Sequence, residues 1–282
     1  MHALISGGNG VIGQALIPLL LEHGITLTSI IRSNVKCVDK NPNLSYLVQS
    51  ITLDNSIDAN IFSKFDCFID LAWEDVRKID SSKHLDFNLK AHKDFISKIV
   101  RLGVQNIFVL GSCYEYGFQQ GELSESTDLI PITNYGKAKK LLLQYLEELS
   151  NSKQCNFIWG RLFYIYGKGQ PSDTFYGQLE KAIANNESAF EIQSADKSLD
   201  YLELGDAAKS ICKLIVNFKN YGAVNICSGI PISLESLAQI ISSDLSSKIE
   251  IKTMNQKTRK HEPNQFWGDA SYLKSILVAI DE

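Results

Sequence analysis

The chain has 282 residues, a formal net charge of −4 at pH 7 and 44% apolar residues. This length is enough for one large core with a smaller attached lobe. The weak negative charge, without a basic run, argues against a protein that binds nucleic acid. No apolar stretch reaches the length that spans a membrane, and the N-terminus enters an apolar strand at once, so no signal peptide is expected. These features favour a cytoplasmic globular protein.

Cysteine and histidine usage fits the same class. The six cysteines form no C-x-x-C pair, and several lie within apolar runs, so they are interpreted as reduced core residues. The five histidines are scattered without metal-ligand spacing, and no metal site is expected. The cysteines are Cys37, Cys67, Cys113, Cys155, Cys212 and Cys227.

The first predicted element is a short apolar strand, Ala3–Ile5, which leads into a glycine-rich turn. Glycine recurs there every third residue, and Val11–Leu21 is then apolar at helical spacing. A turn between a strand and a helix N-terminus directs free backbone N–H groups and the positive end of the helix dipole to one point. Such a turn binds the pyrophosphate of a dinucleotide, although an ordinary glycine turn is the alternative. The residues predicted to contact the cofactor here are Gly7, Gly10, Val11, Ile12 and Gly13.

Strands and helices alternate after this turn. Helices are predicted over Ser82–Leu102 and Asn134–Leu149, and helices of this length between strands indicate βαβ units. The sequence therefore predicts an α/β protein with a Rossmann-type doubly wound parallel sheet. The further strands are expected at Ile25–Ile31, Phe65–Ala72, Asn106–Leu110 and Cys155–Trp159.

The alternation is less regular in the second half of the chain. We expect residues 1–170 to form the dinucleotide-binding core, with returns to its sheet near 200–228. Residues 171–282 are expected to form mainly a smaller, substrate-binding C-terminal lobe.

A Y-x-x-x-K motif begins the second long helix, with Tyr135 and Lys139 on one face. A free tyrosine has a pKa of about 10, and a nearby cation favours the phenolate and lowers that pKa toward neutrality. A second match, Tyr164 to Lys168, contains Gly167 and leads into a loop, so no helix would keep its spacing. Tyr135 is therefore the predicted acid–base residue.

Ser112 follows the strand Asn106–Leu110 at the carboxyl end where parallel sheets bind ligands. Its hydroxyl is expected to hold a substrate oxygen while Tyr135 delivers a proton. A turn or capping serine is the alternative interpretation.

Together these motifs resemble the extended short-chain dehydrogenase/reductase family, which includes nucleotide-sugar epimerases, dehydratases and reductases, over nearly the whole chain. The resemblance implies that the catalytic residues are Ser112, Tyr135 and Lys139, with Lys139 also holding the nicotinamide ribose. The matching segments are the three glycines, Ser112 before Tyr116-Gly117, Tyr135 with Lys139, Arg161–Gln170, Asp200–Ala208 and Ala223–Gly229.

The resemblance also implies contacts around the cofactor. Leu71 and Ala72 would lie beside it, Asp54 would touch the adenine, and Asn88 matches a structural asparagine.

The end of the second strand bears on cofactor choice. Ile31 stands where an NAD enzyme normally places an acidic residue for the ribose 2′-hydroxyl. Arg32 and Ser33 are suited to a 2′-phosphate instead. NADP(H) is therefore favoured over NAD(H), although Arg32 stacking on the adenine would leave the choice open.

The segment after Ser112 bears on the reaction. The acidic pair that dehydratases of this family carry is replaced by Cys113 and Tyr114. The resemblance is strongest to reductases of nucleotide-linked 4-keto-6-deoxyhexoses. A 4-epimerase with tightly bound NAD and a non-enzymatic NAD(P)-sensing protein are the alternatives. The predicted substrate-binding residues are Trp73, Cys113, Tyr114, Arg161 and Arg259.

One position departs from the family pattern. Leu199 replaces an arginine that usually holds the phosphate of the sugar nucleotide, and Lys197 or Arg259 would have to substitute. A homodimer is expected from the resemblance, through the helices that carry Asn88 and Tyr135.

Overall fold

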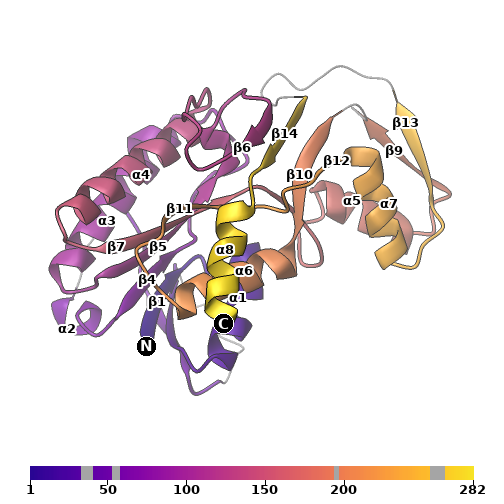
Figure 1. The fold of residues 1–282 in the computed structure, drawn as a ribbon. Coiled ribbons are helices and arrows are strands. Elements are labelled where there is room, and N and C mark those ends of the chain that lie inside the picture. Colours follow the sequence, from indigo (N-terminus) through magenta and orange to yellow (C-terminus); the bar gives the residue numbers. More distant parts are fainter. Residues whose placement is uncertain (33–40, 53–57, 194–196, 255–263) are drawn as a thin grey trace.

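A parallel sheet of seven strands forms the centre of the molecule (Figure 1) in a computed structural model that describes residues 1–32, 41–52, 58–193, 197–254 and 264–282. The strand order is β11-β7-β5-β4-β1-β2-β3, and each neighbouring pair is parallel. This confirms the predicted fold class. The strands are β1 (His2–Ser6), β2 (Thr26–Ile31), β3 (Leu44–Val48), β4 (Cys67–Asp70), β5 (Asn106–Ser112), β7 (Asn156–Leu162) and β11 (Gly222–Ile226).

Helices cover both faces of this sheet (Figure 1). One buried cluster joins the sheet to α1, α6 and α8, and a second joins it to α2, α3 and α4. In the described ranges, no helix is long and apolar enough to cross a membrane. The helices are α1 (Val11–Glu22), α2 (Ala59–Phe62), the π-helical turn η1 (His84–Asn88), α3 (Leu89–Arg101), α4 (Asn134–Asn151), α6 (Leu204–Val216) and α8 (Ser271–Asp281).

The strand order reverses direction at β1, which lies between β2 and β4. Ligands bind doubly wound sheets outside the carboxyl ends of the strands at such a point. Ser6, Asp70 and Ser112 are the last residues of β1, β4 and β5, so the segments that follow them meet at this edge.

A second, smaller unit lies beyond the carboxyl edge (Figure 1). A mixed sheet in the order β12-β10-β14-β6, with β8 paired to β10, connects the core to this lobe. The pair β9 and β13 packs with α5 and α7 around Leu179, Leu237 and Ile241. The remaining elements are η2 (Cys113–Glu115), β6 (Gly121–Leu123), β8 (Tyr164–Tyr166), α5 (Phe175–Ala184), β9 (Ala189–Gln193), β10 (Ser198–Glu203), β12 (Pro231–Ser233), α7 (Leu234–Asp244), β13 (Glu250–Met254) and β14 (Gln265–Gly268).

The C-terminal helix α8 packs on the core and not on the lobe. Leu273 and Ile276 are buried in the same cluster as Leu214 and Ile215 of α6. Helix α8 therefore packs on the core through these two side chains, against β11 and α6.

Candidate active site

The glycine turn joins β1 to α1, and its geometry excludes larger residues at two positions. Gly7 has a φ of +70°, and a Cβ there would lie 2.8 Å from the backbone nitrogen of Ala72. A Cβ on Gly13 would collide with the Gly7 carbonyl oxygen. Helix and strand can therefore approach closely only because these residues are glycines.

The N-terminus of α1 is open to a ligand. Gly10 is the N-cap residue and brings no side chain to the first N–H groups of the helix, which belong to Val11 and Ile12. A Cβ on Gly10 would meet only the Gly7 carbonyl oxygen, at 3.2 Å. The first N–H groups of α1 and the positive end of its dipole therefore lie at the carboxyl end of β1, where a pyrophosphate would bind.

A buried polar network holds the opposite wall of the crevice. The Ser6 hydroxyl donates to Asp70 Oδ1 at 2.6 Å and accepts the Ala72 N–H at 3.1 Å. Asp70 Oδ2 lies 2.6 Å from His92 Nδ1 on α3. The network fixes Leu71 and Ala72 against Gly7. The family resemblance predicts that both residues lie beside the cofactor.

The end of β2 presents Arg32 at the surface. Ile31 is buried within the strand, whereas the Arg32 side chain is 76% exposed and forms an ion pair with Glu74 at 3.2 Å. Ser33 and Asp54, which were predicted to contact the cofactor, and Arg259, which was predicted to contact the substrate, lie outside the described residues.

Three predicted catalytic side chains converge where β5 meets α4. The Ser112 hydroxyl lies close enough to the Tyr135 phenol to act on its pKa. Lys139 Nζ donates to the Leu110 carbonyl oxygen at 2.9 Å, and the residue is only 3% exposed. Thr133 caps α4 by accepting the N–H of the third residue of the helix at 3.0 Å. This cap fixes the first turn of α4, which carries both motif residues.

The electrostatics of the cluster differ from the expectation in one respect. Burial raises the pKa of Tyr135 well above its ordinary value, and the hydrogen bond with Ser112 only partly offsets this. The expectation that Lys139 brings the pKa of Tyr135 toward neutrality is therefore wrong for this structure. Burial also lowers the pKa of Lys139 to about 8, against the opposing charges of Asp70 and Glu115. Tyr135 is thus a protonated group at neutral pH.

Ser112 is held in place by Glu115. The Glu115 carboxylate accepts the Ser112 N–H at 2.7 Å, while the Ser112 hydroxyl accepts the Tyr114 N–H at 3.3 Å. This is a capping box. Since the Ser112 oxygen already accepts one hydrogen bond, its own proton can be donated. The S-x-x-E spacing is the sequence signal that would have identified Glu115.

Arg161 neutralises this buried carboxylate. Its Nε lies 2.8 Å from Glu115 Oε2, its Nη1 donates to the Tyr116 hydroxyl at 2.9 Å, and the residue is 1% exposed. Trp159 Nε1 also donates to Glu115 at 3.0 Å. The structure therefore places Arg161 beneath the Ser112 turn and not at a surface that a substrate would reach.

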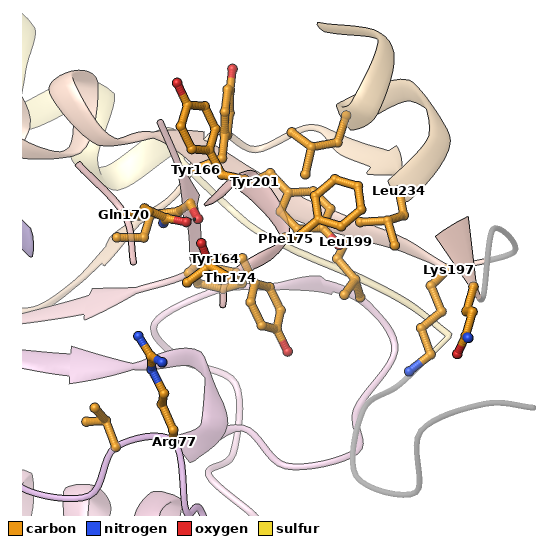
Figure 2. A pocket seen from close by; sticks show the side chains of 16 residues that line it. Arg77, Tyr164, Tyr166, Gln170, Thr174, Phe175, Lys197, Leu199, Tyr201 and Leu234 are labelled. Atoms are coloured by element: carbon orange, nitrogen blue, oxygen red, sulfur yellow. Dashed lines mark hydrogen bonds between the residues drawn. The ribbon is translucent and has the colours of Figure 1, made fainter. Parts of the chain in front are cut away.

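A cavity of about 540 Å³ lies between the core and the lobe (Figure 2). Figure 2 shows Arg77 directed toward it from the loop after β4 and Lys197 at its far side. The Arg77 guanidinium forms an ion pair with Asp173, and Lys197 is 5% exposed. Sequence reasoning did not identify Arg77. The aromatic residues that line the cavity are Phe163, Tyr164, Tyr166, Phe175, Tyr176 and Tyr201.

A row of tyrosine rings connects the catalytic cluster to this cavity. The centroids of Tyr114 and Tyr135 are 6.0 Å apart, those of Tyr114 and Tyr164 are 6.3 Å apart, and Tyr164 is 5.8 Å from Tyr201. Cys113 packs in the apolar cluster beneath them and is 4% exposed. Tyr114 is thus placed between the catalytic tyrosine and the cavity.

The fold and the site define a dinucleotide-dependent enzyme with a Ser–Tyr–Lys cluster. The sequence profile of the NAD dependent epimerase/dehydratase family matches residues 3–227. The chain belongs to that family, which confirms the predicted family and, with its relatives, an NAD(P)-dependent oxidoreductase.

Two relatives match most of the chain. It is 25% identical over 278 residues to the dTDP-6-deoxy-L-talose 4-dehydrogenase (NAD(+)) of Aggregatibacter actinomycetemcomitans, covering 95% of this chain and 99% of that enzyme. It is 27% identical over 265 residues to the dTDP-4-dehydro-6-deoxyglucose reductase of Escherichia coli, covering 88% and 83% of the two chains.

Solved structures share the fold. The UDP-glucuronic acid 4-epimerase of Bacillus cereus, in complex with UDP-glucuronic acid and NAD, superposes with a TM-score of 0.83 at 17% identity. The match covers 99% of this chain and 93% of the epimerase.

Proposed function

We propose that the protein reduces the keto group of a nucleotide-diphosphate-linked 4-keto-6-deoxyhexose to an alcohol, with NADPH as the hydride donor. The observation that carries the proposal is the convergence of Ser112, Tyr135 and Lys139 where β5 meets α4, beside the glycine turn. Two relatives whose names specify oxidoreduction at position 4 of a dTDP-linked 6-deoxysugar support the substrate class.

A nicotinamide cofactor held by the glycine turn and Lys139 would supply a hydride for the carbonyl carbon. Ser112 orients the carbonyl oxygen by donating its hydroxyl proton, and Tyr135 transfers its proton to that oxygen as the alkoxide forms. The phenolate then regains a proton from solvent, so that one hydride and one proton enter the product. The Tyr135 phenol carries its proton at neutral pH and is therefore available as the donor.

Water elimination is disfavoured by the residues after Ser112. A dehydratase needs an acidic side chain there, whereas Cys113 and Tyr114 occupy those positions. We therefore assign Tyr114 to substrate contact, since it links Tyr135 to the cavity.

The cavity is suited to a nucleoside diphosphate. Its volume lies within the range of about 300–1,000 Å³ that is usual for small-molecule sites. Aromatic rings offer stacking surfaces for a base, and Arg77 and Lys197 bring positive charge for the phosphates. Lys197 thereby takes the role of the family arginine that Leu199 replaces. We propose that this cavity binds the nucleotide part of the sugar substrate.

NADPH is proposed from the end of β2, where Ile31 replaces the usual acid and Arg32 stands exposed. The name of the Aggregatibacter relative specifies NAD(+), so the experiment must compare both cofactors. Loss of nicotinamide absorbance should be followed with NADPH or NADH and dTDP-4-dehydro-6-deoxyglucose. The proposal fails if several nucleotide-linked 4-keto sugars leave both cofactors unchanged.

A 4-epimerase is the second candidate, because solved epimerases share the fold. An epimerase would be purified with NAD bound and would interconvert two nucleotide sugars without net cofactor use. Mass analysis of the denatured protein and of the product distinguishes the two activities. The homodimer stays a prediction.

A further inference from the structure

The Lys139 ammonium lies among aromatic faces. Its Nζ is 3.9 Å from the centroid of the Trp73 ring, 5.9 Å from that of Trp159 and 6.0 Å from that of Tyr135. A cation is attracted to such faces, most strongly to tryptophan and most of all when it is desolvated. Lys139 is 3% exposed, so its ammonium group has lost most of its contact with water. The Trp73 ring face partly replaces that lost hydration.

The Trp73 indole is itself fixed by a histidine. Trp73 Nε1 donates to His84 Nδ1 at 3.0 Å, and Asn88 Nδ2 lies 3.4 Å from the same nitrogen. Because both groups are donors, His84 Nδ1 must present its lone pair. His84 Nε2 then carries the proton and donates to the Lys78 carbonyl oxygen at 2.9 Å. The contacts of this histidine therefore require a neutral imidazole in one tautomer.

A π-helical turn brings this histidine to the catalytic tyrosine. The turn η1 places His84 and Asn88 on the same side, and both are fully buried. The His84 ring lies 5.3 Å from the Tyr135 ring, and Trp73 lies 6.3 Å from it. Single π-helical turns occur frequently at functional sites. Here the turn brings the His84 imidazole into contact with Tyr135 and with Trp73, whose ring lies under the Lys139 ammonium.

We propose that Trp73 and neutral His84 are positioning residues, which hold the Lys139 ammonium over the indole face and pack against Tyr135. The inference rests on the proposed role of Lys139 in binding the nicotinamide ribose. It replaces the substrate contact predicted for Trp73 with a contact to the catalytic lysine.

Charges from several elements act on the two titrating groups. Lys139 faces Asp70 at the end of β4 and Glu115 of η2, and both carboxylates favour its ammonium form. Burial lowers the pKa of His84, while the nearby carboxylates of Asp75 and Asp80 oppose this and the Lys139 charge adds to it. His84 is consequently neutral, and Lys139 is charged below about pH 8.

The test measures binding of the reduced cofactor alone, so it does not depend on the sugar substrate. NADPH and NADH fluorescence titrations over pH 6 to pH 10 should show affinity falling as Lys139 loses its proton near pH 8. Trp73→Leu removes the aromatic face and should move this midpoint about one pH unit lower, a tenfold change in the protonation equilibrium. Trp73→Phe keeps a face and should move it less.

Two further variants separate positioning from packing. His84→Gln keeps an acceptor for the indole N–H and should retain most of the wild-type midpoint, whereas His84→Leu should shift it as Trp73→Leu does. Trp267→Phe is the matched control, because Trp267 donates to Glu122 on β6, away from Lys139, and should leave the profile unchanged. Thermal unfolding of each variant identifies any that fail to fold.

An unchanged midpoint in a folded Trp73→Leu protein overturns the inference, as does a wild-type affinity that does not vary with pH. If neither cofactor binds the wild-type protein at any pH, the proposed oxidoreductase function fails instead. The two failures are therefore distinguishable.

Discussion

The Ser112 hydroxyl lies close enough to the Tyr135 phenol to lower its pKa, although one residue ends a central strand and the other begins a helix. Each is fixed by its own cap: Glu115 holds the Ser112 turn, and Thr133 holds the first turn of α4. Two independently anchored hydroxyls thus meet beside the dinucleotide crevice. A structural protein has no need of this arrangement, whereas proton transfer to a substrate oxygen requires it.

Replacement of Tyr135 by phenylalanine tests this directly. The variant loses the proton donor but keeps the ring, so kcat should fall about 10²- to 10⁴-fold. Cofactor affinity should change little, because the phenylalanine ring still packs against Tyr114 and His84. Steady-state rates and cofactor fluorescence titrations measure the two effects.

Tyr145→Phe is the control on the same helix. Its ring lies 5.1 Å from the Lys93 ammonium, a contact that phenylalanine also makes, and wild-type rates are expected. Full activity in Tyr135→Phe would show that the phenol is not the proton donor. Cofactor binding without turnover in both the wild-type protein and Tyr135→Phe would instead support the non-enzymatic NAD(P)-sensing alternative.

The local motifs of the site were readable from sequence because each needs only neighbouring residues. Gly7, Gly10 and Gly13 report a close backbone approach, and Tyr135 and Lys139 lie one helical turn apart. The family match confirms the fold and enzyme class that these motifs predicted.

Contacts between residues far apart in the chain could not be predicted from the sequence. Arg161 was expected to contact substrate, yet the register that pairs it with Gly111 brings it to Glu115. A side chain on Gly111 would collide with Trp159 and crowd Glu115, so this glycine makes room for the buried pair. No local pattern predicts that register. The pairing of β9 with β13 and the cavity lining were missed for the same reason.

The Glu115–Arg161 pair should dominate the stability of the Ser112 turn. Arg161→Met leaves a buried carboxylate without its cation and should lower the free energy of unfolding by about 3–5 kcal/mol. Chemical denaturation measures this. Lys252→Gln removes an exposed partner of Glu250 and should cost less than about 1 kcal/mol. Equal losses in the two variants would contradict a special role for the buried pair.

The buried charge of Lys139 should lower the free energy of unfolding of the protein at neutral pH. Its pKa is lowered to about 8 in the folded protein and is about 10.4 when unfolded. The unfolded chain therefore binds more protons between these values, and stability rises with pH across that window. Below pH 8 the buried charge costs about 3 kcal/mol.

Lys139→Met should accordingly be more stable than wild type near pH 7 and lose that advantage by about pH 10. Its oxidoreductase activity should be abolished. Parallel denaturation curves at several pH values give the difference directly, since other groups titrate equally in both proteins. A variant that is less stable at every pH would show that the contacts of Lys139 outweigh its desolvation.

Arg32 should decide between the two cofactors. If its guanidinium binds a 2′-phosphate, Arg32→Ala should weaken NADPH binding about tenfold or more and affect NADH little. Glu74→Gln removes the carboxylate that forms an ion pair with Arg32. It should strengthen NADPH binding modestly, because the Arg32 guanidinium then binds the phosphate without first breaking that ion pair. Competitive fluorescence titrations with both cofactors report each affinity. Equal weakening of NADH and NADPH in Arg32→Ala would assign Arg32 to stacking on the adenine, and the preference for NADPH would then have no structural basis.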